Sequence, residues 1–509
     1  MPTETARAAL VLLALAAPAV AEAPMSAIDW LSKSVSEAAP PPETGVDEGA
    51  SPVDVAVTVL GAPAPDAVGV LTPEAAGLPA ALWGLGTTAD IAAALAEEPA
   101  EALPALRALM VGLLLAALDP PSDARGEGRL LLARVDKLLA IGAVEPAEAL
   151  IEAARAQGAA PEAELFRRAF DVAMLTGTED RACAAMRAAP DLSPTFPARV
   201  FCLARAGDWN AAALSLRTGQ ALGQITAEED ALLSRFLDPE LAEDEPPLPA
   251  PQPVTPLAWR MFEAIGESLP TNGLPLAFAH ADLRDTAGWR GQIEAAERLA
   301  RAGALSPERL ASVYLARLPA ASGGVWDRVE AFQRFQTALD ARDPGAVAAN
   351  LPRVWARMTE GELEEPFARL FAEPLQRLPL TEDAAAVALR MLLLARPDTL
   401  SSARAPADAT EAFLIGIARG DLAGVTPPDS LARAIAPAFL RPEPGAALQR
   451  LIDEDRRGEA VIAAMAAVAR GTLGALRGVT EGLSALRAAG LAPGGGGGAR
   501  ELMTLDRRG

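Results

Sequence analysis

Few of the 509 residues have side chains suited to catalysis. The chain has one histidine, His280, one tyrosine, Tyr314, and two lysines, Lys33 and Lys137. A Ser-His-Asp or Cys-His system would have to use His280, but no G-x-S-x-G nucleophile turn lies nearby. Zinc-protease helices need two histidines, and neither lysine follows a glycine as a phosphate-binding loop requires. We therefore expect His280 to be a core or surface histidine with its hydrogen bonds satisfied, and we expect no cofactor and no metal.

One glutamate stands in a context typical of glycan-cleaving enzymes. The segment Ala264-Ile265-Gly266-Glu267-Ser268 resembles the catalytic opening of periplasmic lytic transglycosylases, which join an α-solenoid to a domain whose acid is a Glu followed by Ser. A buried glutamic acid there could protonate a glycosidic oxygen. The family's downstream Gly-Met-Gln segment is missing, and Pro270 interrupts the helix that should continue. We expect an ordinary helix end at Glu267 and keep a peptidoglycan-acting enzyme, or its accessory subunit, as the alternative.

The first residues predict export. Residues 1–21 carry Arg7, an apolar run at 8–17 and the small-residue motif Ala19-Val20-Ala21, a pattern typical of a cleaved signal peptide. The apolar run is shorter than the ~20 residues that a transmembrane helix needs. The most apolar later segment, Ala108–Leu118, is bounded by charged residues and predicts a core helix. We therefore expect a periplasmic protein with no membrane insertion after cleavage.

In an exported protein, the two cysteines are expected to form a disulfide. Cys183 and Cys202 are 19 residues apart and fall in consecutive helical segments. In an oxidising compartment such a pair forms a disulfide, and closing a loop of this size stabilises a fold by ~3 kcal/mol. Two free buried thiols are the alternative. Metal binding by the pair is not expected, because no further Cys or His lies at ligand spacing.

The net charge narrows the class of partner. The 45 Lys and Arg residues against 67 Asp and Glu residues leave a net charge of −22 at pH 7. Nucleic acids and anionic membranes both call for clustered positive charge, so neither is expected as a partner. We expect protein partners in the periplasm, or the periplasmic domains of inner-membrane proteins, that present basic patches.

The segment after the leader has no core of its own. Residues 22–52 predict a disordered stretch that contains a short amphipathic helix, Ser26–Val35, and a Pro-rich linker. This helix could dock into a groove of a partner, or fold back on the chain's own helices. The candidate docking residues are Ile28, Trp30, Leu31 and Val35.

The following segment gives the clearest strand signal in the chain. Residues 53–72 predict a short extended or β segment, because Val53–Val59 has valine at every second position. Val68–Leu71 could return as its partner in a hairpin. Alternatively, the unpaired strand could extend a sheet in another protein.

From residue 73 to 490 nearly every segment has a helical pattern. Three junctions look alike, each with a glycine between two helices: Gly142, Gly177 and Gly207. Glycine at such a position permits a left-handed C-cap, and Gly303 and Gly420 repeat the junction. The pattern predicts an all-α fold, an α-solenoid of antiparallel helix hairpins with disordered ends. These junctions resemble tetratricopeptide-type α-solenoids over most of residues 88–490, although that family's Trp/Leu/Gly/Tyr pattern is absent and the repeats are degenerate.

Local signals mark several helix starts and turns. Thr226-Ala227-Glu228-Glu229 is a capping box, and Ser306-Pro307-Glu308 places an N-cap before a first-position proline. Gly84–Ala89 superficially fits a dinucleotide loop, but no strand precedes it, so we expect Thr87 or Thr88 to cap a helix. Residues Ala321–Trp326 form a flexible turn with an early Trp, which could line a site or simply pack into the core.

Prolines and glycines predict the division of the helical region. Residues 238–256 hold seven prolines and five acids and predict a linker between a first helical block, 73–237, and a second, 257–490. Residues 491–509 contain five consecutive glycines and predict a mobile tail.

Taken together, these features favour a non-catalytic periplasmic helical-repeat scaffold that binds other proteins. In type, the chain is similar to uncharacterised Ala-rich helical periplasmic proteins of alphaproteobacteria that are loosely labelled "antifreeze glycopeptide". Accessory proteins that support the flagellar stator are of the same general kind, so flagellar motor or cell-envelope assembly is the implied process. A protein that holds an apolar ligand inside the solenoid is a further alternative.

Overall fold

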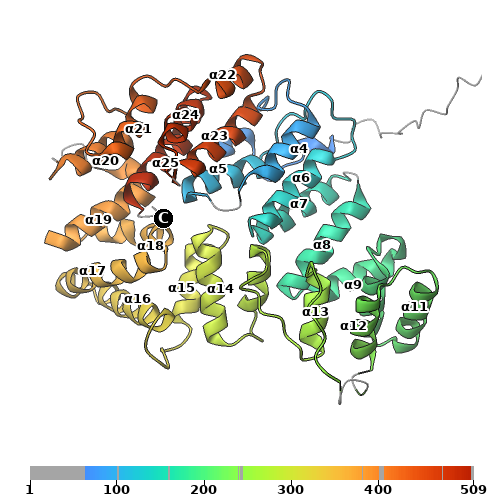
Figure 1. Ribbon diagram of the computed structural model, residues 1–509. Coiled ribbons are helices and arrows are strands. Elements are labelled where there is room, and N and C mark those ends of the chain that lie inside the picture. The colour runs from blue at the N-terminus through green and yellow to red at the C-terminus, as the bar shows by residue number, and fades with distance from the viewer. Residues whose placement is uncertain are drawn as a thin grey trace, which may run out of the picture. The chain divides into compact units, whose positions relative to one another are not determined.

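The regular secondary structure in the described part of the protein is all helical. The computed structural model describes residues 64–99, 102–158, 161–238, 240, 245–380, 382–400, 406–472 and 474–505 (Figure 1). No strand occurs in these ranges, which confirms the predicted all-α, solenoid-like fold class. The predicted leader, the predicted docking helix Ser26–Val35 and the predicted strand Val53–Val59 all lie outside the described residues. Residues 58–509 form one compact unit, and the fold is given for that unit alone.

Helices follow one another along this unit, most of them joined by short connections. The first half contains η1 (Pro65–Ala67), α3 (Pro73–Ala76), α4 (Thr88–Glu97), α5 (Pro104–Leu115), α6 (Arg129–Ala140), α7 (Val144–Ala156), α8 (Glu162–Thr176), α9 (Glu179–Ala188), η2 (Pro190–Leu192), α10 (Phe196–Arg205), α11 (Trp209–Ala221), α12 (Ala227–Leu237) and α13 (Pro256–Ala264). The second half contains η4 (Leu276–Leu283), α14 (Trp289–Arg301), α15 (Pro307–Leu315), α16 (Val325–Asp340), α17 (Pro344–Glu360), α18 (Glu364–Gln376), α19 (Glu382–Ala395), η5 (Pro397–Thr399), α20 (Ala409–Arg419), α21 (Ser430–Leu440), α22 (Ala446–Asp453), α23 (Arg457–Thr472), α24 (Leu476–Ala488) and α25 (Ala492–Thr504).

The predicted helix starts are confirmed in their hydrogen bonds. Thr226 and Glu229 form the reciprocal capping box at the start of α12. Ser306 caps α15 through the backbone NH of Arg309. Thr87 caps α4 by accepting from the backbone NH of Asp90, so Gly84–Ala89 is a helix start. Each cap satisfies a backbone donor that would otherwise lack an intrahelical partner.

The junction glycines have the left-handed backbone that the sequence predicts. Gly142, Gly177, Gly207 and Gly303 have φ angles of 76°, 80°, 81° and 63°. Gly142 is constrained a second time, because a Cβ at this position would lie 2.6 Å from Cγ of Leu276 on η4. A side chain there would therefore disturb both the turn and the packing of η4.

The extended segment at the start of the described chain pairs with the end of α5. The backbone NH groups of Val70 and Leu71 donate to Leu115 O at 2.8 and 3.0 Å. The backbone NH of Ala117 donates to Leu71 O at 2.8 Å, and Leu71 and Ala116 form an isolated parallel bridge. The hydrogen bonds of this segment are thus used within the helical unit. The pairing with Val53–Val59 that the valine pattern predicts lies outside the described residues.

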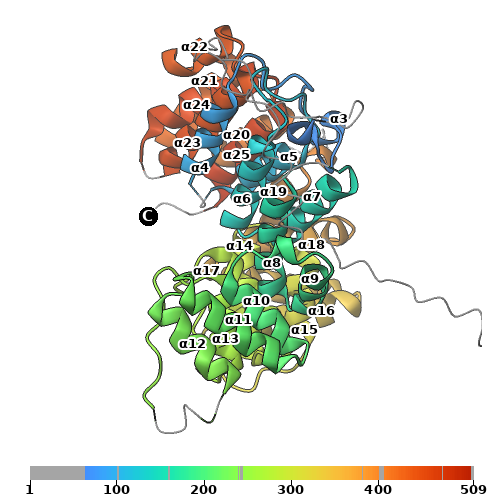
Figure 2. The same cartoon turned by 90° about the vertical axis from the view of Figure 1, so that its right-hand side faces the viewer.

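The first and last helices of the unit share one hydrophobic core. Figures 1 and 2 both show α23–α25 beside α4 and α5, although more than 300 residues separate them in sequence. Backbone hydrogen bonds join these parts, from Gly458 NH to Leu82 O and from Leu85 NH to Asp455 O, both 2.9 Å long. The shared core contains buried side chains from both ends of the chain, including Ile91, Leu113, Leu138, Ile435, Val468 and Leu483.

Two further cores lie along the rest of the helices. Residues of α14–α19 form an aromatic-rich core in which the rings of Phe332, Phe335, Phe367 and Phe371 contact one another, with centroids 4.9 to 6.1 Å apart. Helices α8–α13 form the other, which contains Phe166, Phe170 and Ala173 of α8. A disulfide between Cys183 on α9 and Cys202 on α10 lies in this second core, as the cysteine spacing predicts.

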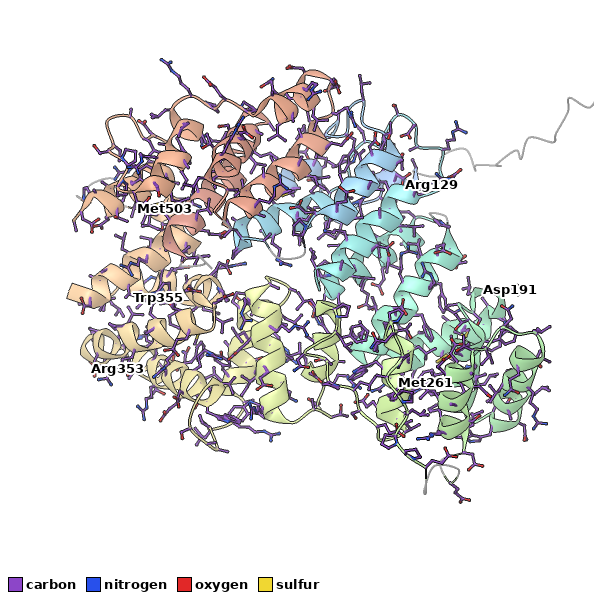
Figure 3. The ribbon with its side chains drawn as sticks, viewed as in Figure 1. Arg129, Asp191, Met261, Arg353, Trp355 and Met503 are labelled. Atoms are coloured by element: carbon purple, nitrogen blue, oxygen red, sulfur yellow. A yellow bond between two sulfur atoms is a disulfide. The ribbon has the colours of Figure 1, made fainter. Side chains whose placement is uncertain are left out.

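Two predicted boundaries differ from the structure. The described residues 245–255 are irregular, but α13 packs back on α8 and α12, and its Met261 lies in the same core as Phe166 (Figure 3). Prolines stop a helix without preventing the next helix from packing on earlier ones, so residues 238–256 do not separate two cores. The predicted mobile tail 491–509 is also wrong over Ala492–Thr504, which form α25 and pack on α5, α20 and α24.

Candidate functional site

The single histidine is a structural residue. His280 on η4 is buried, and its Nε2 lies 2.8 Å from the carbonyl oxygen of Gly142, 138 residues earlier. Burial lowers the pKa of His280, which favours the neutral ring, although the hydrogen bond to Gly142 acts in the opposite direction. The contact ties η4 to the α6–α7 turn. This bears out the expectation of a histidine whose hydrogen bonds are satisfied in the core.

Glu267 has the contacts of a structural anchor. Its Oε1 accepts a hydrogen bond from Nη1 of Arg235 at 2.6 Å, and its Oε2 accepts one from the backbone NH of Leu248 at 2.6 Å. The guanidinium of Arg235 also binds Glu245 and the carbonyl oxygen of Pro246. Both oxygens of Glu267 are therefore engaged in fastening the segment 245–248 to α12. Acid catalysis at this position would require these contacts to be given up.

A buried charged cluster sits in the α14–α19 core. The Oε1 of Glu297 accepts from the Tyr314 hydroxyl at 2.7 Å, and Arg328 binds both carboxylate oxygens at 2.9 and 2.6 Å. Burial raises the pKa of Tyr314 well above its ordinary value, and the negative charge of Glu297 acts in the same direction. The charges are compensated within the cluster, which crosslinks α14, α15 and α16.

A second buried cluster lies near the end of α4. Glu98, Arg107 and Lys137 line a small cavity of about 10 Å³, roughly the room for one water molecule. The ammonium group of Lys137 donates to the backbone carbonyl of Glu98. Burial raises the pKa of the Glu98 carboxyl to about 7, although the charges of Lys137 and Arg470 oppose the shift. The cavity is too small for an organic substrate, so the cluster is a structural site that titrates near neutral pH.

A groove with room for a ligand lies on the surface of α16 and α17. Its volume is about 760 Å³, within the range of sites that bind small molecules or peptide segments. Short side chains leave this space open, since four alanines line it. The groove is lined by Leu318, Pro319, Ala321 and Ser322 of the α15–α16 loop, by Glu330, Gln333, Arg334, Thr337 and Ala338 of α16, and by Ala341, Asp343, Ala346 and Asn350 around the start of α17.

Backbone contacts hold the loop side of this groove in place. The Nε2 of Gln333 donates to the carbonyl oxygens of Tyr314 and Arg317, both at 2.7 Å, and so fastens the end of α15 to α16. The loop then turns at Gly323 and Gly324, which have φ angles of 91° and 56°. Trp326 follows and packs on Trp289, with ring centroids 5.2 Å apart.

The Ala321–Trp326 turn therefore serves both roles that its sequence allowed. Ala321 and Ser322 line the groove, whereas Trp326 packs into the core. Two exposed leucines are not predicted from the sequence: Leu318 at the groove is 82% exposed, and Leu315, three residues earlier, is 48% exposed. The signal that could have identified them is a pair of leucines directly before a Pro- and Gly-containing turn, where a helix can no longer bury them.

The chemistry of the groove suits binding. Its charged pair, Glu330 and Arg334, is joined by a 2.6 Å ion pair on the surface of α16. Asp343 accepts from the backbone NH groups of Gly345 and Ala346, which caps α17. The remaining lining is apolar, amide or hydroxyl. These groups can contact a bound small molecule or peptide segment.

Three exposed apolar side chains lie on α11 or directly after it. Trp209, Leu214 and Leu222 are 53%, 65% and 61% exposed. The groove on α16 and α17 has a defined volume and lining, so it is the better-defined candidate.

The sequence predicts no metal site and no membrane insertion, and the structure bears on these predictions only in the residues that it describes. Within them, no three His, Cys, Asp or Glu side chains are arranged to hold a metal ion. None of the helices in this part of the chain combines the length and hydropathy needed to cross a bilayer. The docking residues Ile28, Trp30, Leu31 and Val35 lie outside it. Comparison of the chain with protein-family models, curated proteins and solved structures finds no match.

Proposed function

We propose that this protein is a non-catalytic helical-repeat scaffold of the periplasm that binds a protein partner in the groove between the 318–322 loop and helices α16 and α17. The observation that carries the proposal is the 760 Å³ groove with Leu318 almost fully exposed at its edge. An exposed leucine beside a groove lined by small residues can insert into a partner, while partner side chains fill the groove.

The type of partner follows from the lining and from the charge. Alanine methyl groups accept apolar side chains, and the Oε1 of Gln333, the amide of Asn350 and the Oγ1 of Thr337 as an acceptor can bind a peptide backbone. A chain with a net charge of −22 associates faster with partners that carry basic patches. We therefore propose a basic protein segment as the ligand, in flagellar motor or cell-envelope assembly.

Site-specific photocrosslinking in the full chain tests this proposal. A photoreactive residue in place of Thr337, inside the groove, should give a crosslinked adduct with one defined protein in cells that export the chain. The same residue in place of Gln220, which is exposed on α11, serves as the position control.

A variant that blocks the groove distinguishes binding in the groove from nonspecific association. Ala341→Arg places a long side chain in the groove at an exposed position, whereas Ala221→Arg makes the same change on α11. The Thr337 adduct should disappear with Ala341→Arg and persist with Ala221→Arg. An adduct that survives Ala341→Arg, or that forms equally from Gln220, would overturn the proposal.

A further inference from the structure

The last helix of the described chain has a sequence that does not favour helix. α25 contains five consecutive glycines, Gly494–Gly498. Each glycine in a helix interior costs about 1 kcal/mol relative to alanine, and helices of this length are marginal in water even with good helix formers. The helical state of α25 must therefore come from its contacts with the rest of the fold.

The glycines are where α25 meets α5. A Cβ on Gly497 would lie 2.6 Å from Cβ of Ala105, closer than real Cβ atoms approach. A Cβ on Gly494 would lie 3.0 Å from Cδ2 of Leu109. The glycine run thus lets the backbone of α25 lie directly on α5, and the same residues that weaken the isolated helix allow the docked one.

A carboxylate on α25 completes the start of α5. Both oxygens of Glu501 accept a hydrogen bond from the backbone NH of Ala105, at 2.9 and 2.8 Å. Leu103 at the N-cap position has no side-chain hydrogen bond to offer, and Pro104 opens the helix. Glu501 therefore caps α5, whose first residue, Pro104, lies 397 residues earlier in the sequence. The negative charge of Glu501 is also favourable at a helix N-terminus.

Docking of α25 also carries costs. Burial lowers the pKa of the Arg500 guanidinium, although the charges of Glu501 and Asp398 act against the shift. The Nε of Arg500 is buried and has no hydrogen-bond partner among the described residues. On the other side, Met503 packs beside Leu393 of α19 and Leu414 of α20 (Figure 3). Apolar contacts and one helix cap thus stabilise the docked α25, whereas five glycines within the helix and a buried guanidinium destabilise it.

From this balance we infer that α25 is a clasp, a helix that forms only when docked on α5 and whose release separates the last helix from the first ones while the remaining helices stay folded. Release would uncover Ala105, Leu106 and Leu109 of α5 and leave α5 without its cap. The clasp gives the scaffold a closed and an open state, independent of the groove on α16 and α17.

Hydrogen exchange of the full chain, with two neighbouring glycine variants, tests the inference. Gly497→Ala should clash with Ala105 and abolish protection in α25, while α24 and α16 keep theirs. Gly496→Ala is the matched control, because its Cβ would meet only Nη1 of Arg500, at 3.4 Å. There the better helix former should raise the protection of α25 by about five-fold.

A crosslinked variant provides a second, independent measurement. A Cβ on Gly494 would lie 3.8 Å from Cβ of Leu109, the mean spacing in disulfides, so Leu109→Cys with Gly494→Cys should lock the clasp. Trypsin should cleave the wild type after Arg500 under native conditions and should no longer do so in the oxidised double variant. Exchange of α25 in the wild type at the rate of α24, with no native cleavage after Arg500, would show a permanent core helix and overturn the inference.

Discussion

Tyr314 and Glu297 form a direct hydrogen bond, 2.7 Å long, inside the α14–α19 core. Arg328 binds the same carboxylate through two nitrogens, so one glutamate on α14 joins α15 and α16. The ring of Tyr314 also packs edge-on against Phe332. The only tyrosine of the chain is thus part of a structural crosslink beneath the helix that forms the groove.

Removing the shared carboxylate should destabilise the fold strongly. Glu297→Gln leaves the guanidinium of Arg328, which is 11% exposed, without its counter-ion, and we expect a loss of about 3 kcal/mol in the free energy of unfolding. Tyr314→Phe removes one hydrogen bond and should cost about 1 kcal/mol. Urea unfolding measures both. Glu294→Gln on the same helix breaks the exposed pair with Arg290 and should cost less than about 0.5 kcal/mol. Equal effects of Glu297→Gln and Glu294→Gln would contradict the buried crosslink.

Glu98 should make stability depend on pH in an unusual direction. Burial raises its pKa from an ordinary value of 4.5 to about 7, so between these values the folded state binds more protons than the unfolded state. The stabilising contribution of the protonated group is complete below about pH 4.5 and is lost as the pH rises to about 7. Relative to Glu98→Gln, the wild type should therefore lose roughly 2 kcal/mol between the two ends of this range.

The comparison with Glu98→Gln isolates this group from other titrations. Burial also raises the pKa of Asp171 to about 6, and that carboxyl is present in both proteins. Urea unfolding across the range gives the difference directly. A difference between the two proteins that does not change with pH would show that Glu98 is solvated in the folded protein.

The disulfide should be present and should stabilise the α8–α13 core. Denatured, non-reduced protein should gain no mass on alkylation, whereas reduced protein should gain two alkyl groups. Replacing both Cys183 and Cys202 by Ser should lower the free energy of unfolding by about 3 kcal/mol, because the bridge closes a loop of 19 residues. A gain of two alkyl groups without reduction would refute the bridge.

Glu267→Gln distinguishes an anchor from a catalytic acid. As an anchor, the residue balances the buried guanidinium of Arg235, and the variant should lose about 2 kcal/mol of stability as measured by urea unfolding. Glycan-turnover assays on purified peptidoglycan should show the same background for both proteins. Turnover by the wild type that disappears in a folded Glu267→Gln variant would instead establish the enzymatic alternative.

The groove could be predicted only in part. The turn Ala321–Trp326 was identified because glycines and an adjacent aromatic residue are visible in the sequence. Thr337 and Asn350 gave no signal, because they lie on different helices and line one hollow only after α16 and α17 pack together. In the sequence Leu318 is an ordinary apolar residue, and only the fold shows that its side chain is 82% exposed.

By itself, the sequence determined the features that depend on neighbouring residues. The caps at Thr226 and Ser306, the left-handed turn at Gly142 and the all-helical class follow from hydrogen bonds and backbone angles within a few residues. Only the tertiary structure decided that Val70 and Leu71 pair with the end of α5, that α13 rejoins the core before it, and that a run of glycines becomes a helix. These outcomes depend on contacts between distant segments, whose packing energy exceeds the local preference of the backbone.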